Sequence, residues 1–549
     1  MEYNLLRVID LEVSVKTKKE DDLKIVDRVS FDIKPGEVIA LIGESGSGKT
    51  TISLGCMGYT RPGCRITGGA VHLGDKSIFD QSLSDLQKLR GSAITYVAQS
   101  AAASFNGAMT INSQVTEIPI VTKSMTRAQA IVKAEKLYAD LDLPEPNKIG
   151  QRYPHQVSGG QLQRLMAAMA MISDPQLLIL DEPTTALDVT TQIEVLYSFK
   201  RLIRKRNAAA IYVSHDLSLV AQIADNILVL KNGKKIEYGQ TEQIISEPQN
   251  NYTKELMEAA HVMPKQICTK QSKLSKKAPL LKMTNITAGY GKNQGNLALT
   301  KINLEVGVGE TVGIIGESGS GKTTLGRVIS GLMSPLEGNV FLEGKELAQK
   351  VAKRKRYELQ QIQFAFQMAD VALNPLQKVE KILSRPIQFY RKLSRKDSLI
   401  EVARLLERVD LPTDFANRFP LELSGGQRQR INLARALAAL PKLIICDEIT
   451  SALDTIVAQQ ILELLESLQE ELRISYLFIS HDISIVSQIS ERVVVMHHGE
   501  VVEEGPTAKI LTSPSHDYTM LLLNSVPEMR TDWLDEAITK RRRLLENLN

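Results

Sequence analysis

The sequence predicts an α/β fold made of two tandem copies of one domain. Three observations support this prediction. Residues 43–51 return unchanged at 316–324, three further motifs recur downstream in the same order, and short apolar segments typical of buried parallel strands alternate with helical patterns. A chain of 549 residues is also too long for a single hydrophobic core. The repeat has the size of a whole domain, so we expect a duplication and not a solenoid.

The composition is that of an ordinary globular protein and disfavours several function classes. Hydrophobic residues make up 43% of the chain, and the net charge is only +4, which does not indicate a nucleic-acid-binding surface. We expect no signal peptide and no membrane span, because the N-terminal segment is acidic and no apolar run is long enough. A membrane role would therefore come through partners. The cysteines have no disulfide or metal-ligand spacing and fit a reducing cytosol: Cys56, Cys64, Cys268 and Cys446.

Each copy of the repeated segment, GESGSGKTT, lies between an apolar run and a helical pattern. Glycines in such a turn let backbone N–H groups surround an anion at the positive end of the helix. Lys49 is then placed to reach the β- and γ-phosphates of a nucleotide, and Thr50 to ligate Mg²⁺. A chance match would be the alternative for one copy, but two identical copies make it negligible. We assign to phosphate binding Gly43, Ser45, Gly46, Gly48, Lys49, Thr50 and Thr51, with Gly316, Ser318, Gly319, Gly321, Lys322, Thr323 and Thr324.

The downstream motifs supply further groups for nucleotide chemistry. Asp181 ends an apolar strand, where its carboxylate can hold Mg²⁺, and Glu182 can polarise the water that attacks the γ-phosphorus. A bland surface turn is the alternative for such a pair, and a histidine after a strand is by itself more often an ordinary hydrogen-bonded residue. The SGGQ segments join glycines to a helix start and so offer N–H groups to an anion. The motifs are SGGQ at 158–161 and 424–427, Asp-Glu at 181–182 and 447–448, and Ser-His-Asp at 214–216 and 480–482.

In this order, and present twice, the motifs resemble those of the ATP-binding-cassette (ABC) ATPases over nearly the whole chain. The resemblance implies that each half has a RecA-like α/β core of the phosphate-loop NTPase type, an antiparallel β subdomain and a helical subdomain. It adds a glutamine after a strand in each half and a histidine that senses the γ-phosphate. The catalytic residues implied are Glu182, Glu448, His215 and His481; the Mg²⁺ ligands implied are Thr50, Gln99, Asp181, Thr323, Gln367 and Asp447.

The resemblance also implies an intramolecular pseudo-dimer with two shared ATP sites. The signature of one cassette would cover the γ-phosphate held by the other, and neither half lacks a catalytic glutamate or a signature serine. We therefore expect two hydrolytically competent sites. Tyr290 occupies the place where the family stacks adenine on an aromatic ring, whereas the first half has Val15, which predicts a weaker grip there. The signature residues are Ser158, Gly159, Gly160 and Gln161, with Ser424, Gly425, Gly426 and Gln427.

We place the first domain at 1–261, a linker at 262–279 and the second domain, with a C-terminal tail, at 280–549. The linker is rich in lysine and lacks apolar periodicity, so we expect it to be flexible. Helical inserts with apolar residues at helical spacing are predicted at 126–141 and 396–409.

A narrower resemblance is to the ATPase subunits of dipeptide, oligopeptide and nickel importers, whose fused two-cassette members serve peptides or peptide-like cargo such as microcins and glutathione. It implies two integral membrane permeases, an extracytoplasmic substrate-binding protein and a location at the cytoplasmic face of a bacterial inner membrane. Many single-cassette relatives carry an iron–sulfur cysteine cluster just after the cassette, but only Cys268 lies in that region here, so we expect no cluster. The segments that carry the resemblance are Tyr153–Gln156, Ser104–Asn106, Asn251–Thr253, Ala372–Pro375, Val502–Thr507 and Ser513–Thr519.

Two other functions remain as alternatives at this point. A soluble twin-cassette ATPase that acts on ribosomes in translation would share the catalytic motifs, but such proteins typically have a long, charged helical linker. A drug or macrolide exporter ATPase would share the catalytic motifs but not the tail. The short linker at 262–279 and the importer-like tail favour import.

Overall fold

The computed structural model describes residues 4–16, 22–184, 187–261, 278–290, 297–451 and 453–548. By its contacts the chain divides into two units, one of 1–261 with 527–543 and one of 262–526 with 544–549. Residues 527–543, which the sequence analysis assigns to the second domain, thus group with the first unit. Cys268 and nearly all of the linker at 262–279 lie outside the described residues, so the expectations of flexibility and of no iron–sulfur cluster stay predictions.

The core of the first unit is a six-stranded sheet in the order β10-β9-β3-β8-β7-β6. All neighbours are parallel except β10 and β9, and β3, β7 and β8 are buried at every position. Parallel strands covered on both faces are uninterrupted apolar runs in sequence, which explains why the sequence predicts them. The strands are β3 Val38–Ile42, β6 Ile94–Val97, β7 Leu177–Asp181, β8 Ala209–Val213, β9 Asn226–Lys231 and β10 Lys234–Gln240.

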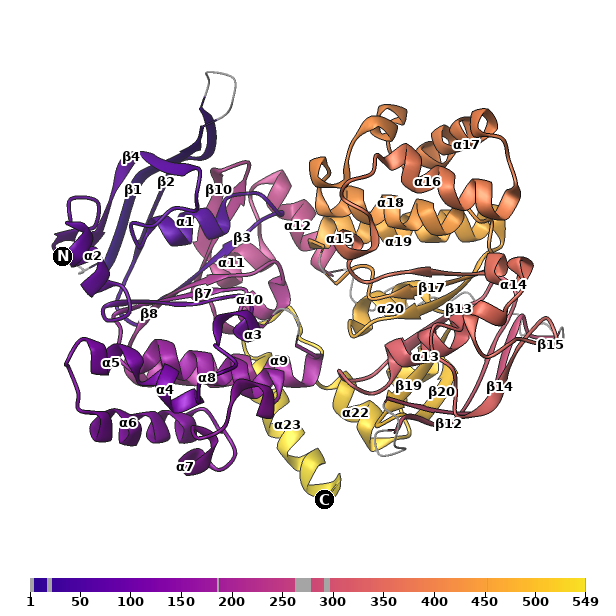
Figure 1. The fold of residues 1–549 in the computed structure, drawn as a ribbon. Coiled ribbons are helices and arrows are strands. Elements are labelled where there is room, and N and C mark those ends of the chain that lie inside the picture. Colours follow the sequence, from indigo (N-terminus) through magenta and orange to yellow (C-terminus); the bar gives the residue numbers. More distant parts are fainter. Residues whose placement is uncertain are drawn as a thin grey trace. The chain divides into compact units, whose positions relative to one another are not determined.

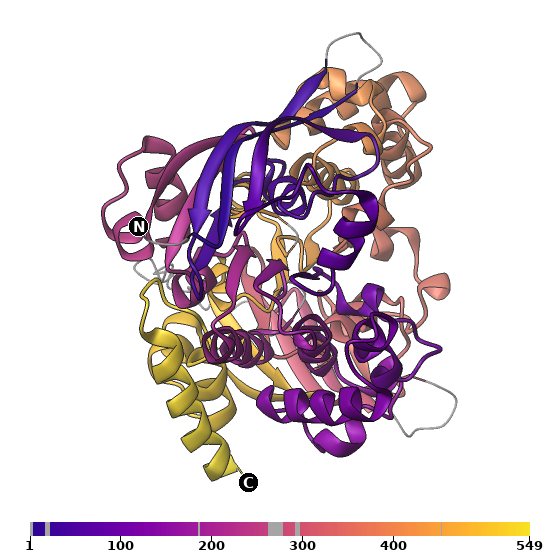
Figure 2. The same cartoon turned by 90° about the vertical axis from the view of Figure 1, so that its left-hand side faces the viewer.

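A second, antiparallel sheet of the first unit has the order β2-β1-β4-β5. It and the helices α4–α7 lie on opposite sides of the core sheet (Figures 1 and 2). Thr126 begins α6 through a capping box with Gln129, as expected from the predicted insert. The elements are β1 Leu6–Val15, β2 Leu23–Ile33, β4 Cys64–Leu73, β5 Lys76–Ser77, α1 Lys49–Gly55, α2 Leu83–Leu89, α3 Ala101–Ser104, α4 Ile111–Val115, α5 Glu117–Val121, α6 Arg127–Asp140, α7 Pro146–Ile149, α8 Gly159–Met171, α9 Val189–Arg206, α10 Leu217–Ile223, α11 Thr241–Ser246 and α12 Asn251–His261.

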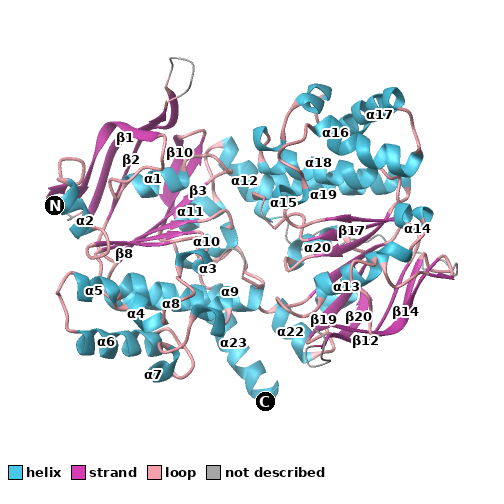
Figure 3. Ribbon diagram, in the orientation of Figure 1, coloured by secondary structure: helices cyan, strands magenta, loops and turns pink. Residues whose placement is uncertain are grey.

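The second unit repeats this topology. Its core sheet has the order β16-β17-β18-β13-β19-β20, and its antiparallel sheet the order β12-β11-β14-β15; α16 and α17 lie outside α18 and α19 (Figure 3). The strands are β11 Leu281–Gly289, β12 Leu297–Val306, β13 Thr311–Ile315, β14 Glu337–Leu342, β15 Lys345–Glu346, β16 Ile362–Ala365, β17 Leu443–Asp447, β18 Ser475–Ile479, β19 Arg492–His497 and β20 Glu500–Pro506.

The helices of the second unit include the predicted insert, which forms α17. The predicted fold class, an α/β core with an antiparallel β part and a helical part in each half, is confirmed. The helices are α13 Lys322–Ser330, α14 Arg356–Gln361, α15 Ala369–Ala372, α16 Val379–Pro386, α17 Arg395–Arg408, α18 Gly425–Leu437, α19 Thr455–Leu472, α20 Ile483–Ile489, α21 Thr507–Thr512 and α22 Asp517–Leu523.

The C-terminal segment that groups with the first unit is held by Gln222 of α10. The Gln222 amide donates to the carbonyl oxygens of Glu528 and Arg530, each at 2.8 Å, and accepts from the backbone N–H of Leu534 at 3.0 Å. Leu534 lies in α23, Trp533–Leu548, and is fully buried. Ion pairs from α9, such as Arg541 with Glu194 at 2.7 Å, add to this docking.

Candidate active sites

The first residue of each phosphate loop has a backbone conformation that only glycine adopts without strain. Gly43 has φ +142°, and a Cβ there would lie 2.1 Å from the carbonyl oxygen of Leu230; at Gly316 the distance to the Met496 oxygen would be 2.2 Å. The turn therefore passes close to the neighbouring strand and enters α1 or α13 directly. This geometry explains why the same glycines occur in both halves.

A buried lysine lies across each loop. Lys49 Nζ donates to the carbonyl oxygens of Gly43 at 2.7 Å and Glu44 at 2.9 Å, and Lys322 Nζ makes the equivalent two bonds, each at 2.7 Å. The ammonium group is thus held at the start of the following helix, where backbone N–H groups also gather. An anion seated in the loop would meet both.

The structure adds one loop serine in each unit that the sequence analysis missed. The hydroxyls of Ser47 and Ser320 are buried and have no hydrogen-bond partner among the described residues. A buried hydroxyl without a partner is costly, and a phosphate oxygen in the loop would supply one. The residues present therefore fit a nucleotide. The sequence could have indicated these serines only by their position, since each lies two residues before the lysine of its loop.

Two of the three predicted metal ligands contact each other in each unit, whereas the third, Gln99 or Gln367, hydrogen-bonds the neighbouring glutamate. Thr50 Oγ1 donates to Asp181 Oδ1 at 3.0 Å, and Thr323 Oγ1 to Asp447 Oδ1 at 3.0 Å. Burial raises the pKa of Asp447 to about 6, against the hydrogen bond from Thr323. A hydroxyl and a carboxylate beside a phosphate site are the hard oxygen donors that Mg²⁺ takes, so the residues fit this ion.

The predicted catalytic glutamate of the first unit, Glu182, is oriented by two neighbours. Gln99 Nε2 donates to Glu182 Oε2 at 2.8 Å, and His215 Nδ1 lies 3.2 Å from Glu182 Oε1. Glu182 has φ +50°, a left-handed conformation that costs on the order of 1 kcal/mol or more and is common at active sites. Burial alone would lower the pKa of His215, but the hydrogen bond and charge of Glu182 raise it.

The second unit repeats this arrangement. Gln367 Nε2 donates to Glu448 Oε2 at 2.6 Å, His481 Nδ1 lies 3.4 Å from Glu448 Oε1, and Glu448 has φ +48°. Burial alone would raise the pKa of Glu448, but the hydrogen bond and charge of His481 lower it. The lowered pKa of Glu448 favours its ionised form beside Asp447, as a water-polarising base requires.

The signature residues serve their own helix in each unit. Ser158 caps α8 through a capping box with Gln161, and Ser424 caps α18 with Gln427. A Cβ on Gly160 would lie 2.1 Å from Thr191 of α9, so glycine is needed for this helix contact. The structure brings no signature serine into a hydrogen bond with the phosphate loop of its own unit among the described residues, and the pairing of Ser158 and Ser424 with the opposite cassette stays a prediction.

The two predicted adenine positions differ in side chain as expected. Tyr290 directly follows β11, is half exposed, and its hydroxyl lies 3.0 Å from Thr324 Oγ1. Val15 ends β1, the equivalent strand. The adenine contact itself stays a prediction.

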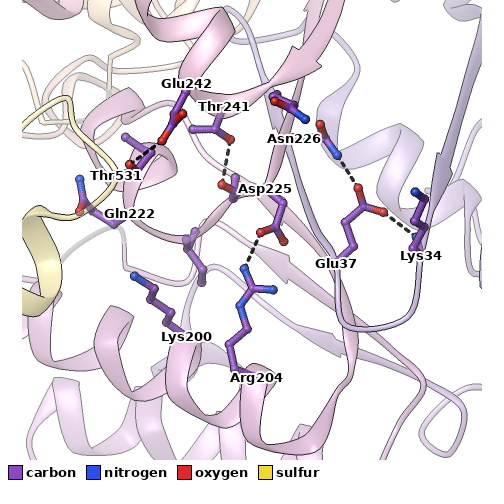
Figure 4. A pocket seen from close by; sticks show the side chains of 14 residues that line it. Lys34, Glu37, Lys200, Arg204, Gln222, Asp225, Asn226, Thr241, Glu242 and Thr531 are labelled. Carbon is purple, nitrogen blue, oxygen red and sulfur yellow. Dashed lines mark hydrogen bonds and ion pairs between the residues drawn. The ribbon is translucent and has the colours of Figure 1, made fainter.

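A cavity of about 520 Å³ on the first unit lies away from these residues. It is lined by parts of α9, α10 and β10 and by Thr531 of the C-terminal segment, which hydrogen-bonds Glu242 (Figure 4). Its walls carry both signs of charge, and pairs such as Arg204 with Asp225 link them (Figure 4). None of its lining residues is a predicted site residue, so it is not the nucleotide site.

Comparison with known families decides between the possible identities of these sites. The ABC transporter family matches residues 26–185 and 299–451, which together exceed half of the chain. This chain belongs to the ABC transporter family. The C-terminal region of oligopeptide/dipeptide transporters also matches, at 236–289 and 502–549. These matches confirm the family, the narrower peptide-transporter resemblance and the ATPase class predicted from the sequence.

Several proteins are similar to this ABC ATPase over nearly its whole length. It is 36% identical to the glutathione import ATP-binding protein GsiA of Shigella dysenteriae serotype 1, covering 95% of this chain and 90% of that protein. Identity to GsiA of Escherichia coli strain K12 is 35% with the same coverage. Among solved structures, cbiO1 from Clostridium perfringens, part of the ABC transporter complex cbiONQ, is 28% identical with a TM-score of 0.39, covering 43% of this chain and 92% of that one. Within the described ranges, no helix is both long and apolar enough to cross a membrane.

Proposed function

We propose that this ABC ATPase powers the uptake of peptides or peptide-like cargo through two integral membrane permeases. An extracytoplasmic binding protein would deliver the cargo, and the ATPase would sit at the cytoplasmic face of a bacterial inner membrane. The observation that carries the proposal is the double match to the peptide-transporter C-terminal region at 236–289 and 502–549. Identity to glutathione import proteins over 95% of the chain supports it. No comparison supports the translation alternative.

Each cassette would hold ATP with Mg²⁺ on its own phosphate loop, and binding would close the two cassettes on each other. Lys49 and Ser47 would contact phosphate oxygens, and Thr50 and Asp181 would hold the cation. Glu182 would accept the proton of the attacking water while His215 keeps its carboxylate in place. The second cassette would repeat these roles, and phosphate release would reopen the pair.

An apolar surface beside Gln367 supports docking of a permease segment. Met368, Val371 and Leu376 are 59%, 79% and 85% exposed, directly after the glutamine that contacts Glu448. Exposed apolar side chains gathered on one stretch are typical of interaction sites. Movement of a permease helix there would reach the catalytic glutamate through a single side chain.

Affinity purification of the tagged chain from gently solubilised membranes tests this function. We expect two multi-span permeases to co-purify with the wild type and to be lost from a Val371→Glu/Leu376→Glu variant that still binds ATP. Leu83→Glu is the matched control, because Leu83 of α2 is 79% exposed in a different part of the fold. Recovery with ribosomes and no integral membrane protein would contradict the proposal.

A further inference from the structure

The metal-binding aspartates of the two cassettes have different partners. In the first cassette Asp181 Oδ1 accepts a hydrogen bond from Thr50, and Asp181 Oδ2 accepts one from the Tyr96 hydroxyl at 2.6 Å. In the second cassette Asp447 accepts, among the residues that the structure describes, only the bond from Thr323. Both oxygens of the first carboxylate are held, whereas one oxygen of the second is.

Strand register explains the difference by a single substitution. Tyr96 of β6 pairs with Ile179 of β7, two residues before Asp181. Phe364 of β16 pairs with Ile445 of β17, two residues before the second aspartate. The two rings thus occupy equivalent places, and the second lacks only the hydroxyl. Phe364 is buried and packs on Phe366, with ring centroids 4.6 Å apart.

We propose that Tyr96 is a positioning residue that fixes the Asp181 carboxylate for its divalent cation, and that the first site therefore binds this cation more tightly than the second. A short bond from a phenol to a carboxylate is charge-assisted and restricts the rotation of the acceptor. It uses the oxygen that Thr50 does not contact, so it can persist when the threonine hydroxyl turns to the cation. Partners behind a metal ligand typically change metal affinity by about tenfold to a hundredfold.

The inference rests on the proposed function only in that both cassettes bind nucleotide with a divalent cation. Mn²⁺ in place of Mg²⁺ gives a direct readout that does not depend on turnover. We would titrate Mn²⁺ into the full chain with a non-hydrolysable ATP analogue and follow free Mn²⁺ by electron paramagnetic resonance. Lys322→Ala isolates the first site, and Lys49→Ala isolates the second, because each removes the ammonium group from one phosphate loop.

We expect the first site to bind Mn²⁺ about tenfold more tightly than the second. Tyr96→Phe should lower the first site to the level of the second, and Phe364→Tyr should raise the second site. The gain in Phe364→Tyr cannot arise from misfolding. The melting temperature of Tyr96→Phe, measured without nucleotide, checks that its loss of Mn²⁺ affinity does not arise from misfolding.

Equal Mn²⁺ affinities that neither substitution changes would overturn the role of Tyr96 and leave the nucleotide sites standing. Absence of nucleotide-dependent Mn²⁺ binding in both backgrounds would overturn the site assignment as well. If no permease co-purifies with the wild-type chain while the Mn²⁺ affinities are as expected, the transport function alone would be contradicted.

Discussion

The two cassettes arrange their predicted catalytic side chains in the same way but differ in the residues around them. The first has Tyr96 behind the predicted metal-binding aspartate and Val15 at the predicted adenine position. The second has Phe364 and Tyr290 at these places. The other contacts are shared: their distances differ between the cassettes by no more than a few tenths of an ångström. They involve the lysine, threonine, glutamine, glutamate and histidine of each site. The two halves have therefore kept the groups that we expect to contact phosphate, cation and water, while the residues behind these groups differ.

The largest expected effect tests whether the shared contacts give two working sites. Glu182→Gln and Glu448→Gln should each lower ATP hydrolysis, and the double variant should lose on the order of a hundredfold or more, because each site loses its base. Phosphate release per chain measures this, with exposed Glu247→Gln as the control. Full activity in the Glu448→Gln variant would show that the second cassette is not hydrolytic.

The next prediction compares equivalent glutamines of α10 and α20. Gln222→Ala leaves three backbone groups of the C-terminal segment without a partner, a loss on the order of 3 kcal/mol. Amide hydrogen exchange at 527–543 should accelerate by roughly two orders of magnitude. Gln488→Ala should leave these rates within about twofold. Unchanged exchange in Gln222→Ala would mean that the segment is held elsewhere.

At the adenine end the second cassette should depend on its aromatic residue. Tyr290→Ala in the Lys49→Ala background should weaken ATP binding by about twofold to tenfold, the usual worth of a stacked ring. Val15→Ala in the Lys322→Ala background should change affinity less than twofold, since no ring is lost. Calorimetric titration with a non-hydrolysable analogue measures both. Equal losses of ATP affinity in the two variants would contradict the proposed adenine contact of Tyr290.

The smallest effect is a pH dependence of stability. Burial alone would raise the pKa of Glu503, but hydrogen bonds, including those from Ser515 and His516, lower it from 4.5 to about 2. Its contribution is therefore present above pH 4.5 and is lost as the pH falls toward 2. Glu503→Gln should lower Tm by roughly one to three degrees near neutral pH, and the difference should shrink below pH 4.5.

Glu237→Gln is the matched variant in the first cassette. Two backbone N–H groups donate to Glu237, from Gln249 and Asn250, whereas the Ser515 hydroxyl adds a third donor at Glu503. Glu237→Gln should therefore lower Tm less than Glu503→Gln does. A Tm difference that grows on acidification would contradict both assignments.

Local pattern was enough to predict the parts of the fold and site that are close in sequence. The apolar run before the first phosphate loop forms β3, which is buried at every position, as the sequence pattern predicts. The phosphate loop, the Asp-Glu pair and the histidine each lie at the end of such a strand. Parallel strands bring their carboxyl ends to one edge of the sheet, so these groups meet there.

Pairings across long sequence distances could not be predicted in this way. Tyr96 lies in an apolar strand and looks like a core residue, because its hydroxyl partner is 85 residues away. Gln222 contacts a segment more than 300 residues downstream, which no periodicity indicates. Such contacts depend on strand register and docking, which single-sequence patterns do not encode.

The most direct test of two complete sites in one chain is a nucleotide count. Native mass spectrometry of the Glu182→Gln/Glu448→Gln variant with ATP and Mg²⁺ should find two ATP molecules bound to each chain, since the substitutions spare every phosphate and cation contact. One ATP for each chain at saturation would contradict the account, because one cassette would then be a structural partner only.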